Sequence, residues 1–240
     1  MSIQPFALAL ALSVALAAPA MADPIRIVAL GDSLTAGYGL AADEAFPARL
    51  EAALKARGYD LVIVNAGVSG DTASDGLARL DWSVGPDADA VIVELGANDA
   101  LRGVDPAITR KAMGDIMARL DERGIPVLLA GMRAPPNLGH DYVQAFEPIY
   151  SDLAESHGAL LYPFFLDGVA ARPGLNQADG IHPTADGVDI IVERILPSVE
   201  ELIERVGEET KSGALHPGGQ QPMLPVIRDG GASCRGCSPA

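Results

Sequence analysis

The chain has 240 residues, of which 49% are hydrophobic and 20% are charged, so it can bury one sizeable core and is too short to favour two full domains. Its formal net charge is −15, and all of this charge lies outside the uncharged first 22 residues. No cluster of lysine and arginine relieves the negative charge, which argues against nucleic acid and anionic membrane surfaces as partners.

The first 22 residues have the pattern of a secretory signal peptide. An apolar stretch over residues 6–18 is followed by a small-x-small sequence at Ala20-Met21-Ala22. The stretch is shorter than the ~20 apolar residues that a membrane-spanning helix needs, which predicts a cleaved signal and a periplasmic or secreted protein without stable membrane insertion. An uncleaved membrane anchor remains the alternative, because the stretch before the apolar run contains no lysine or arginine.

Five apolar runs, rich in β-branched residues, alternate with segments of helical periodicity. Near-continuous apolarity is typical of strands that are buried on both faces of a parallel sheet. The pattern therefore predicts a three-layer α/β/α sandwich with right-handed crossovers. Residues 46–57 and 188–206 follow the three-four spacing of helices, and Pro197 is expected to kink or divide the second of these. The predicted strands cover residues 25–30, 61–65, 90–95, 126–132 and 159–164.

From Gly207 to the C-terminus the chain is rich in glycine and proline and has no helical or strand period. We expect a disordered tail over residues 207–240, which leaves residues 23–206 as the folded domain. The tail holds both cysteines, Cys234 and Cys237, whose spacing is compatible with half a zinc site, a redox pair or a local disulfide. No second pair and no nearby histidine completes a metal set, so we predict no metal site and a feature outside the fold.

Polar motifs follow the predicted strands. Ser33 comes after the first strand, Gly67 after the second and Asn98 after the third, while Asp179 and His182 stand together in DGIHP ahead of the last helix. An open parallel sheet places its sites beyond the carboxyl ends of its strands, so these residues are expected to meet at one edge.

The residue types fit nucleophilic catalysis. A serine hydroxyl needs a base, which His182 can provide, and an imidazole needs a carboxylate to fix its tautomer, which Asp179 can provide. The backbone N–H groups of Ser33 and Gly67 and the side-chain amide of Asn98 can form an oxyanion hole. The alternatives are that Ser33 is only a helix N-cap and that Asn98 is only a turn residue. Neighbouring Asp32 and Asp99 are expected to support the loops around them.

The blocks GDSLTAGYG, NAGVSGDT, LGANDALRG and DGIHP, in this order, resemble the SGNH (GDSL) hydrolase superfamily, and within it the secreted bacterial thioesterases, arylesterases and lysophospholipases. The likeness runs from about Ile25 to about Pro197. It implies a flavodoxin-like strand order of 2-1-3-4-5, no cofactor and hydrolysis of acyl esters and thioesters through an acyl-serine. The resemblance also implies that Ser33 is the nucleophile, that His182 is the base and that Asp179 orients His182. It implies that Gly67 and Asn98 are oxyanion donors. Ala97 departs from the family pattern, in which a second glycine or a threonine is common.

Residues 100–105 and 133–139 are expected to form loops that flank the site. The resemblance implies that the first of these loops lines an acyl groove, with Leu101, Pro135 and Leu138 as substrate-binding residues. We expect a monomer that acts on a small-molecule ester or thioester. Two alternatives stay open: an acetylesterase for polysaccharides and a non-catalytic ligand-binding protein on a flavodoxin-like core.

Overall fold

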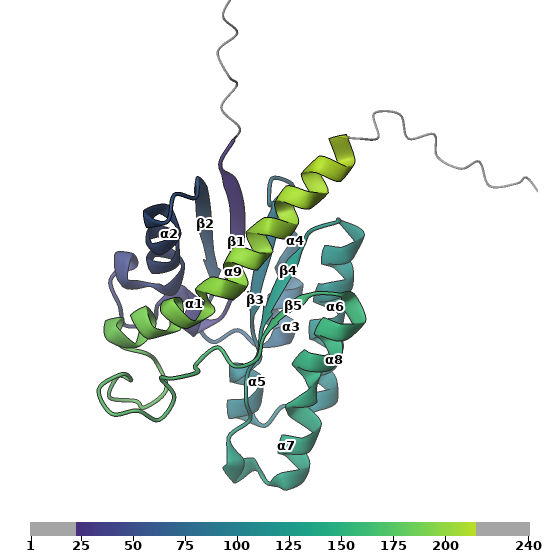
Figure 1. Cartoon of the computed structure of the whole chain (residues 1–240). Coiled ribbons are helices and arrows are strands. Elements are labelled where there is room, and N and C mark those ends of the chain that lie inside the picture. The colour runs from purple at the N-terminus through teal and green to yellow at the C-terminus, as the bar shows by residue number, and fades with distance from the viewer. Residues whose placement is uncertain (1–22, 215–240) are drawn as a thin grey trace, which may run out of the picture.

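A five-stranded parallel sheet of order β2-β1-β3-β4-β5 forms the centre of the protein (Figure 1). The computed structural model describes residues 23–214. Each predicted strand is present with boundaries shifted by a few residues, and both the fold class and the strand order are confirmed. The strands are β1 (Ile25–Gly31), β2 (Leu61–Gly67), β3 (Ala90–Glu94), β4 (Val127–Ala130) and β5 (Leu160–Tyr162).

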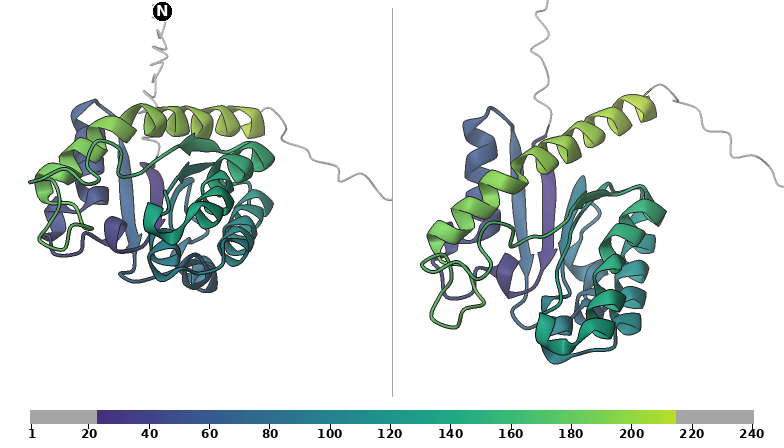
Figure 2. Two further views of the ribbon diagram at one scale, coloured as in Figure 1. Left: turned by 90° about the horizontal axis from the view of Figure 1, so that it is seen from below. Right: turned by 60° about the horizontal axis from the view of Figure 1, so that its bottom comes forward.

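Helices cover both faces of the sheet and complete the three layers. α9 packs with α2 on one face, while α3, α6 and α8 pack together on the other (Figures 1 and 2). The α-helices are α1 (Ser33–Ala36), α2 (Phe46–Ala56), α3 (Ala73–Ala78), α4 (Leu80–Ser83), α5 (Ala97–Arg102), α6 (Pro106–Glu122), α7 (His140–Phe146), α8 (Pro148–His157) and α9 (Ala185–Ala214), and two short 3₁₀ helices are η1 (Ala42–Glu44) and η2 (Pro136–Leu138).

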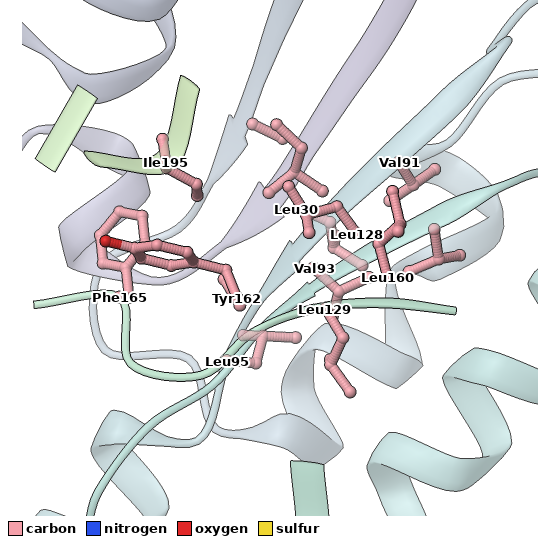
Figure 3. Packing of buried hydrophobic residues seen from close by; sticks show 14 of the residues in the cluster. Leu30, Val91, Val93, Leu95, Leu128, Leu129, Leu160, Tyr162, Phe165 and Ile195 are labelled. Atoms are coloured by element: carbon pink, nitrogen blue, oxygen red, sulfur yellow. The ribbon is translucent and has the colours of Figure 1, made fainter. Parts of the chain in front are cut away.

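Burial follows the position of each strand in the sheet. Every residue of the inner strands β3 and β4 is buried, whereas the edge strand β2 alternates between buried and partly exposed residues over its first half. Figure 3 shows Leu30, Val93 and Leu129 of three neighbouring strands in the core. Continuous apolar runs are needed here because helices cover both faces of an inner strand.

The last helix agrees with part of its prediction and ends later than predicted. α9 is one helix that contains Pro197, so of the two expected outcomes the proline does not divide the helix, and the helix bends along its course in Figures 1 and 2. α9 also continues through Gly207 to Ala214, so the tail does not begin at residue 207. The residues after Gly207 include Glu, Lys and Ala, which favour helix, and one internal glycine costs only about 1 kcal/mol.

Two predictions concern residues outside the described part of the chain. The signal peptide over residues 1–22 lies there, as does the remainder of the tail, residues 215–240, with Cys234 and Cys237. Among residues 23–214, no helix combines the length and the apolar character that a membrane crossing requires.

The register of β1 with β2 sets Gly31 beside Gly67 at the carboxyl ends of the two strands. A Cβ atom on Gly67 would lie 2.3 Å from the backbone nitrogen of Ala36 and 2.7 Å from its Cα. These are backbone atoms of α1, so they cannot move aside as a flexible side chain could. Only glycine lets α1 approach the end of β2.

We therefore expect Gly67→Ala to lower the free energy of unfolding by about 1–3 kcal/mol or more, because overpacking forces backbone shifts. Urea unfolding followed by circular dichroism measures this change. Gly114→Ala is the control, since a Cβ there would meet its nearest neighbour, Leu153 Cδ2, at an ordinary 3.6 Å. That change within α6 should stabilise by about 0.5–1 kcal/mol. Equal stability of Gly67→Ala and the wild type would contradict the close approach.

Candidate active site

Ser33 lies at the tight turn between β1 and α1. The N-cap of α1 is Asp32, whose side-chain Oδ1 accepts a hydrogen bond from the Leu34 N–H at 3.0 Å. Ser33 is thus the first residue of the helix and its hydroxyl is not used for capping, so the interpretation of Ser33 as an N-cap is wrong. The cap fixes the turn, and the turn presents the hydroxyl at the carboxyl edge of the sheet.

His182 reaches Ser33 from the loop before α9, although 149 positions separate the two residues. The distance from His182 Nε2 to Ser33 Oγ is 3.0 Å, and the distance from His182 Nδ1 to Asp179 Oδ2 is 2.6 Å. An ionised carboxylate only accepts hydrogen bonds, so Nδ1 must donate to Asp179, which leaves Nε2 to accept the proton of the serine hydroxyl. The structure thus brings together the three residues predicted to be catalytic.

Asp179 is fixed by its own turn. Its Oδ1 accepts the backbone N–H groups of Ile181 at 2.9 Å and His182 at 3.0 Å, while Oδ2 faces the imidazole. The His182 hydrogen bond, followed by these two backbone bonds, lowers the pKa of Asp179 from 3.8 to about 2. The carboxylate therefore stays ionised through the whole range in which an imidazole changes its charge.

Two contacts around His182 were not foreseen from the sequence. The ring of Tyr38 lies against the imidazole, with ring centroids 4.4 Å apart and planes tilted by 35°. Gln177 links the segment of Tyr38 to the loop of His182 by two hydrogen bonds. Its side-chain Nε2 donates to the Tyr38 carbonyl at 2.7 Å, and its backbone N–H donates to the His182 carbonyl at 2.7 Å. The only sequence signal was the aromatic residue within GDSLTAGYG, the serine block.

Asn98 lies in the first turn of α5, so residues 100–102 belong to a helix and not to the predicted loop. Its side-chain Nδ2 donates to Asp32 Oδ2 at 3.0 Å and to the Asp71 carbonyl at 3.0 Å. Burial raises the pKa of Asp32 from 3.8 to about 6, against the lowering effect of the hydrogen bonds from Leu34 and Asn98. These bonds hold the Asn98 amide beside the turn of residues 31–35 that carries Ser33, which we call the nucleophile turn.

Asp99 has the supporting role that was predicted for it. The residue is fully buried, its Oδ2 accepts the Ala73 N–H at 2.8 Å, and its Oδ1 accepts the Thr109 hydroxyl at 2.9 Å. These bonds connect α5 with the start of α3 and with α6. The segment that carries Asn98 is therefore anchored from behind, which explains why it forms a helix and not an open loop.

The backbone N–H of Gly67 is not available for the oxyanion role that was predicted for it. Its N–H donates to Asn65 Oδ1 at 3.0 Å, so this amide is already used and is not free to bind an oxyanion. Gly70, three residues further on, has a φ of +92°, and its N–H has no hydrogen-bond acceptor among residues 23–214. It directly precedes Asp71, whose carbonyl Asn98 binds. A second glycine in NAGVSGDT, at the turn, was the signal in the sequence.

A cavity of about 490 Å³ opens beside the three residues that were predicted to be catalytic. Ser33, Asn98 and His182 form part of its wall, and most of the remaining wall is apolar. Leu101 and Pro135 line the cavity as predicted, whereas Leu138 does not. Further apolar lining residues are Leu34, Met132, Phe164, Leu166 and Ile181.

Leu138 is the last residue of η2, and within this 3₁₀ turn only Pro136 contributes to the cavity wall. Among residues 23–214, no group of three or more histidine, cysteine, aspartate or glutamate side chains is placed to hold a metal ion.

Comparison with known proteins agrees with this geometry. A profile of the GDSL-like Lipase/Acylhydrolase family matches residues 29–190. The chain is 38% identical to "Esterase TesA" of Pseudomonas aeruginosa, over 74% of this chain and 89% of the relative. It is also 38% identical to "Thioesterase 1/protease 1/lysophospholipase L1" of Escherichia coli K12, over 77% and 86% of the two chains. The crystal structure of AlinE4, an SGNH-hydrolase family esterase, shares 49% identity and a TM-score of 0.64, over 76% of this chain and 98% of AlinE4.

Proposed function

Because the chain belongs to the GDSL-like Lipase/Acylhydrolase family and is an ester hydrolase, we propose that it cleaves acyl esters and thioesters through an acyl intermediate on Ser33. The hydrogen-bonded series from Asp179 through His182 to Ser33, at the wall of an apolar cavity, is the observation that carries this proposal. The chain is an enzyme, so the alternative of a non-catalytic binding protein is wrong.

In the acylation step, Ser33 Oγ attacks the carbonyl carbon of the substrate while His182 Nε2 takes the hydroxyl proton. The ionised Asp179 stabilises the resulting imidazolium through the bond at Nδ1. The tetrahedral intermediate then collapses, the bond to the alcohol or thiol breaks, and His182 returns its proton to the leaving group. An acyl-serine and a free alcohol or thiol are the products of this half-reaction.

In the second half-reaction, water attacks the acyl-serine. His182, neutral again, takes a proton from the water as its oxygen bonds to the acyl carbon. The second tetrahedral intermediate collapses when the carbon–Oγ bond breaks, and the proton passes from His182 to Ser33 Oγ. The carboxylic acid leaves, and the enzyme is restored without any cofactor taking part in a step.

Three N–H donors are available for the oxyanion. As the first residue of α1, Ser33 has a backbone N–H without an intrahelical acceptor. The N–H of Gly70 replaces that of Gly67 in our proposal, since only the latter is already bonded. Asn98 supplies the third donor by turning one N–H from the Asp71 carbonyl to the oxyanion, while its bond to Asp32 keeps the amide in place.

The cavity favours an apolar acyl chain over an acetyl group. Its volume of about 490 Å³ is larger than an acetyl group would fill, and an acetyl group would contact little of its mostly apolar wall. The polysaccharide acetylesterase alternative therefore has less support than an esterase for longer acyl chains.

We further propose that the enzyme acts as a monomer outside the cytoplasm. The signal-peptide pattern of residues 1–22 supports the location. The monomer is supported by the fact that one chain supplies Ser33, Asp179 and His182.

Ser33→Ala tests the function directly. The variant should lose covalent labelling by a fluorophosphonate and should hydrolyse p-nitrophenyl butyrate with a kcat lower by about 10⁴- to 10⁶-fold. Ser151→Ala is the matched control, because Ser151 is exposed and its hydroxyl bonds, among residues 23–214, only the Pro148 carbonyl at 3.2 Å. Labelling that persists in Ser33→Ala would place the nucleophile elsewhere.

Asn98→Ala tests the oxyanion hole. The kcat should fall by about 10²- to 10³-fold with a smaller change in KM, because the lost hydrogen bond is made to the transition state. The exposed Asn137, in η2, provides the control Asn137→Ala, which should keep the wild-type kcat. An unchanged kcat in Asn98→Ala would remove Asn98 from the mechanism.

A series of p-nitrophenyl esters tests the acyl cavity. With each added methylene that the cavity buries, kcat/KM should rise by up to about fourfold, from ~0.8 kcal/mol per methylene, until the cavity is filled. Leu101→Ala should weaken octanoyl ester hydrolysis more than acetyl ester hydrolysis, since Leu101 lines the cavity. Leu138→Ala should change neither. Equal losses in the two leucine variants would refute the assignment of the cavity wall.

A further inference from the structure

Glu94 is a buried carboxyl group behind the nucleophile turn that the catalytic steps do not use. It is the last residue of β3, it is fully buried, and it lies beside Gly31 in the register of the sheet. Its Oε2 accepts the Thr35 hydroxyl at 2.7 Å and the Asp32 N–H at 3.4 Å. Its Oε1 is buried and has no hydrogen-bond partner among the described residues. Glu94 thus contacts both ends of the turn that carries Ser33.

The absence of a side chain at Gly31 makes these contacts possible. A Cβ atom at this position would lie 2.0 Å from Thr35 Oγ1 and 2.7 Å from Glu94 Oε2. The turn is therefore shaped to admit the bond between Glu94 and Thr35. Gly31 belongs to the serine block, but Glu94 stands 63 positions away from it and only the sheet brings the two residues together.

No cation that the structure describes pairs with Glu94. Asp32, in the nucleophile turn, is a second buried carboxyl group, and Tyr150 of α8 donates its hydroxyl to the Leu95 carbonyl at 2.9 Å. Arg79, at the end of α3, donates to the Gly31 carbonyl at 2.8 Å and forms its ion pair with Asp71 at 2.6 Å. The other titratable groups that act electrostatically on this part of the structure are Asp99 of α5, which raises the pKa of Tyr150, and His182, which lowers the pKa of Asp32.

A charged Glu94 would be costly in this setting. One carboxylate oxygen would lack any donor, and a like charge would stand beside it on Asp32. A neutral acid leaves only an unpaired hydroxyl group. Burying this group costs far less free energy than burying an unpaired carboxylate oxygen that carries half of the negative charge. Burial first, and the charge of Asp32 second, raise the pKa of Glu94 well above its usual value.

We propose that Glu94 is an uncharged carboxylic acid at working pH and that it is a positioning residue for the nucleophile turn. As a neutral acceptor it holds the Thr35 hydroxyl and the Asp32 N–H, which fixes the first turn of α1 under Ser33. Asp32 then carries the single negative charge of the pair and accepts the Asn98 amide at 3.0 Å. The part of this inference that concerns catalysis rests on the proposed function, whereas the protonation state does not.

The pH dependence of unfolding tests the protonation state. A folded-state pKa above the unfolded value of 4.5 means that the folded protein keeps a proton that the unfolded chain releases, so this group destabilises the fold as the pH rises through and above 4.5. Glu94→Gln has the same shape without the proton. The ratio of the wild-type unfolding constant to that of Glu94→Gln should therefore rise about tenfold per pH unit above pH 5, until Glu94 ionises in the fold.

Glu204→Gln is the control for this measurement, because Glu204 is exposed on α9 and should give a ratio that does not change with pH. Asp32 is present in all three proteins, so its own titration cancels. A ratio for Glu94→Gln that stays flat between pH 5 and pH 8 would show an ionised Glu94 and overturn the inference.

Kinetics on p-nitrophenyl butyrate test the positioning role. Glu94→Gln should keep the wild-type kcat within about threefold, because glutamine retains a neutral acceptor at the position of Oε2. Glu94→Leu, which leaves the Thr35 hydroxyl and the Asp32 N–H unpaired, should lower kcat by about tenfold or more with little change in KM. A wild-type kcat in Glu94→Leu would overturn the positioning role.

Thr35→Val serves if Glu94→Leu does not fold, because it removes the same hydrogen bond and leaves Glu94 in place. It should lower kcat several-fold at an unchanged KM, and a wild-type kcat would again contradict the role. Failure of the proposed function is a separate outcome: a wild-type protein without esterase turnover would still show the pH-dependent unfolding ratio, since that ratio depends only on the fold.

Discussion

The register of β1 against its two neighbours is the constraint on which the site depends. Gly31 at the end of β1 pairs with Gly67 of β2 on one side and with Glu94 of β3 on the other. Three chain segments therefore leave the sheet at the same level, and each enters a turn or helix that carries a polar group of the site. Backbone atoms of α1 approach Gly67 closely, and the side chains of Thr35 and Glu94 approach Gly31, so the two glycines let α1 lie directly on this edge.

Asp179 with His182 and Asp32 with Glu94 form two pairs whose electrostatic environments are opposite. Asp179 lies at the surface and receives a histidine and two backbone N–H groups, so its charge is well stabilised. Asp32 and Glu94 lie in the interior, where burial disfavours the charge on each and where the charge of Asp32 also disfavours a charge on Glu94. The exposed carboxylate serves the imidazole, and the buried pair sets the geometry of the turn and of Asn98.

The cavity and the catalytic residues are built from segments that are far apart in sequence. The wall of the cavity combines Ser33 and Leu34 of the serine block, most of α5, the segment after β4 and the segment between β5 and α9. α9 packs against α2 and the sheet, and this packing anchors the loop that brings His182 within 3.0 Å of Ser33. α9 thus contributes to the alignment of His182, although none of its residues lines the cavity.

The sequence alone determined the strands, the three layers and the grouping of Ser33, Asp179 and His182, because apolar periodicity and short motifs record local preferences and the residue types that the chemistry needs. It did not determine which N–H groups are free. Asp32, not Ser33, caps α1, Asn65 accepts the N–H of Gly67, and Pro136 rather than Leu138 lines the cavity from η2. It also did not single out Glu94, which follows a strand and has no motif of its own. The cap of α1 and the Asn65–Gly67 bond join residues only two positions apart, and the local turn geometry selects them. The bonds from Thr35 to Glu94 and from Asn98 to Asp32 span 59 and 66 positions, so they form only when the tertiary structure brings the strand ends together.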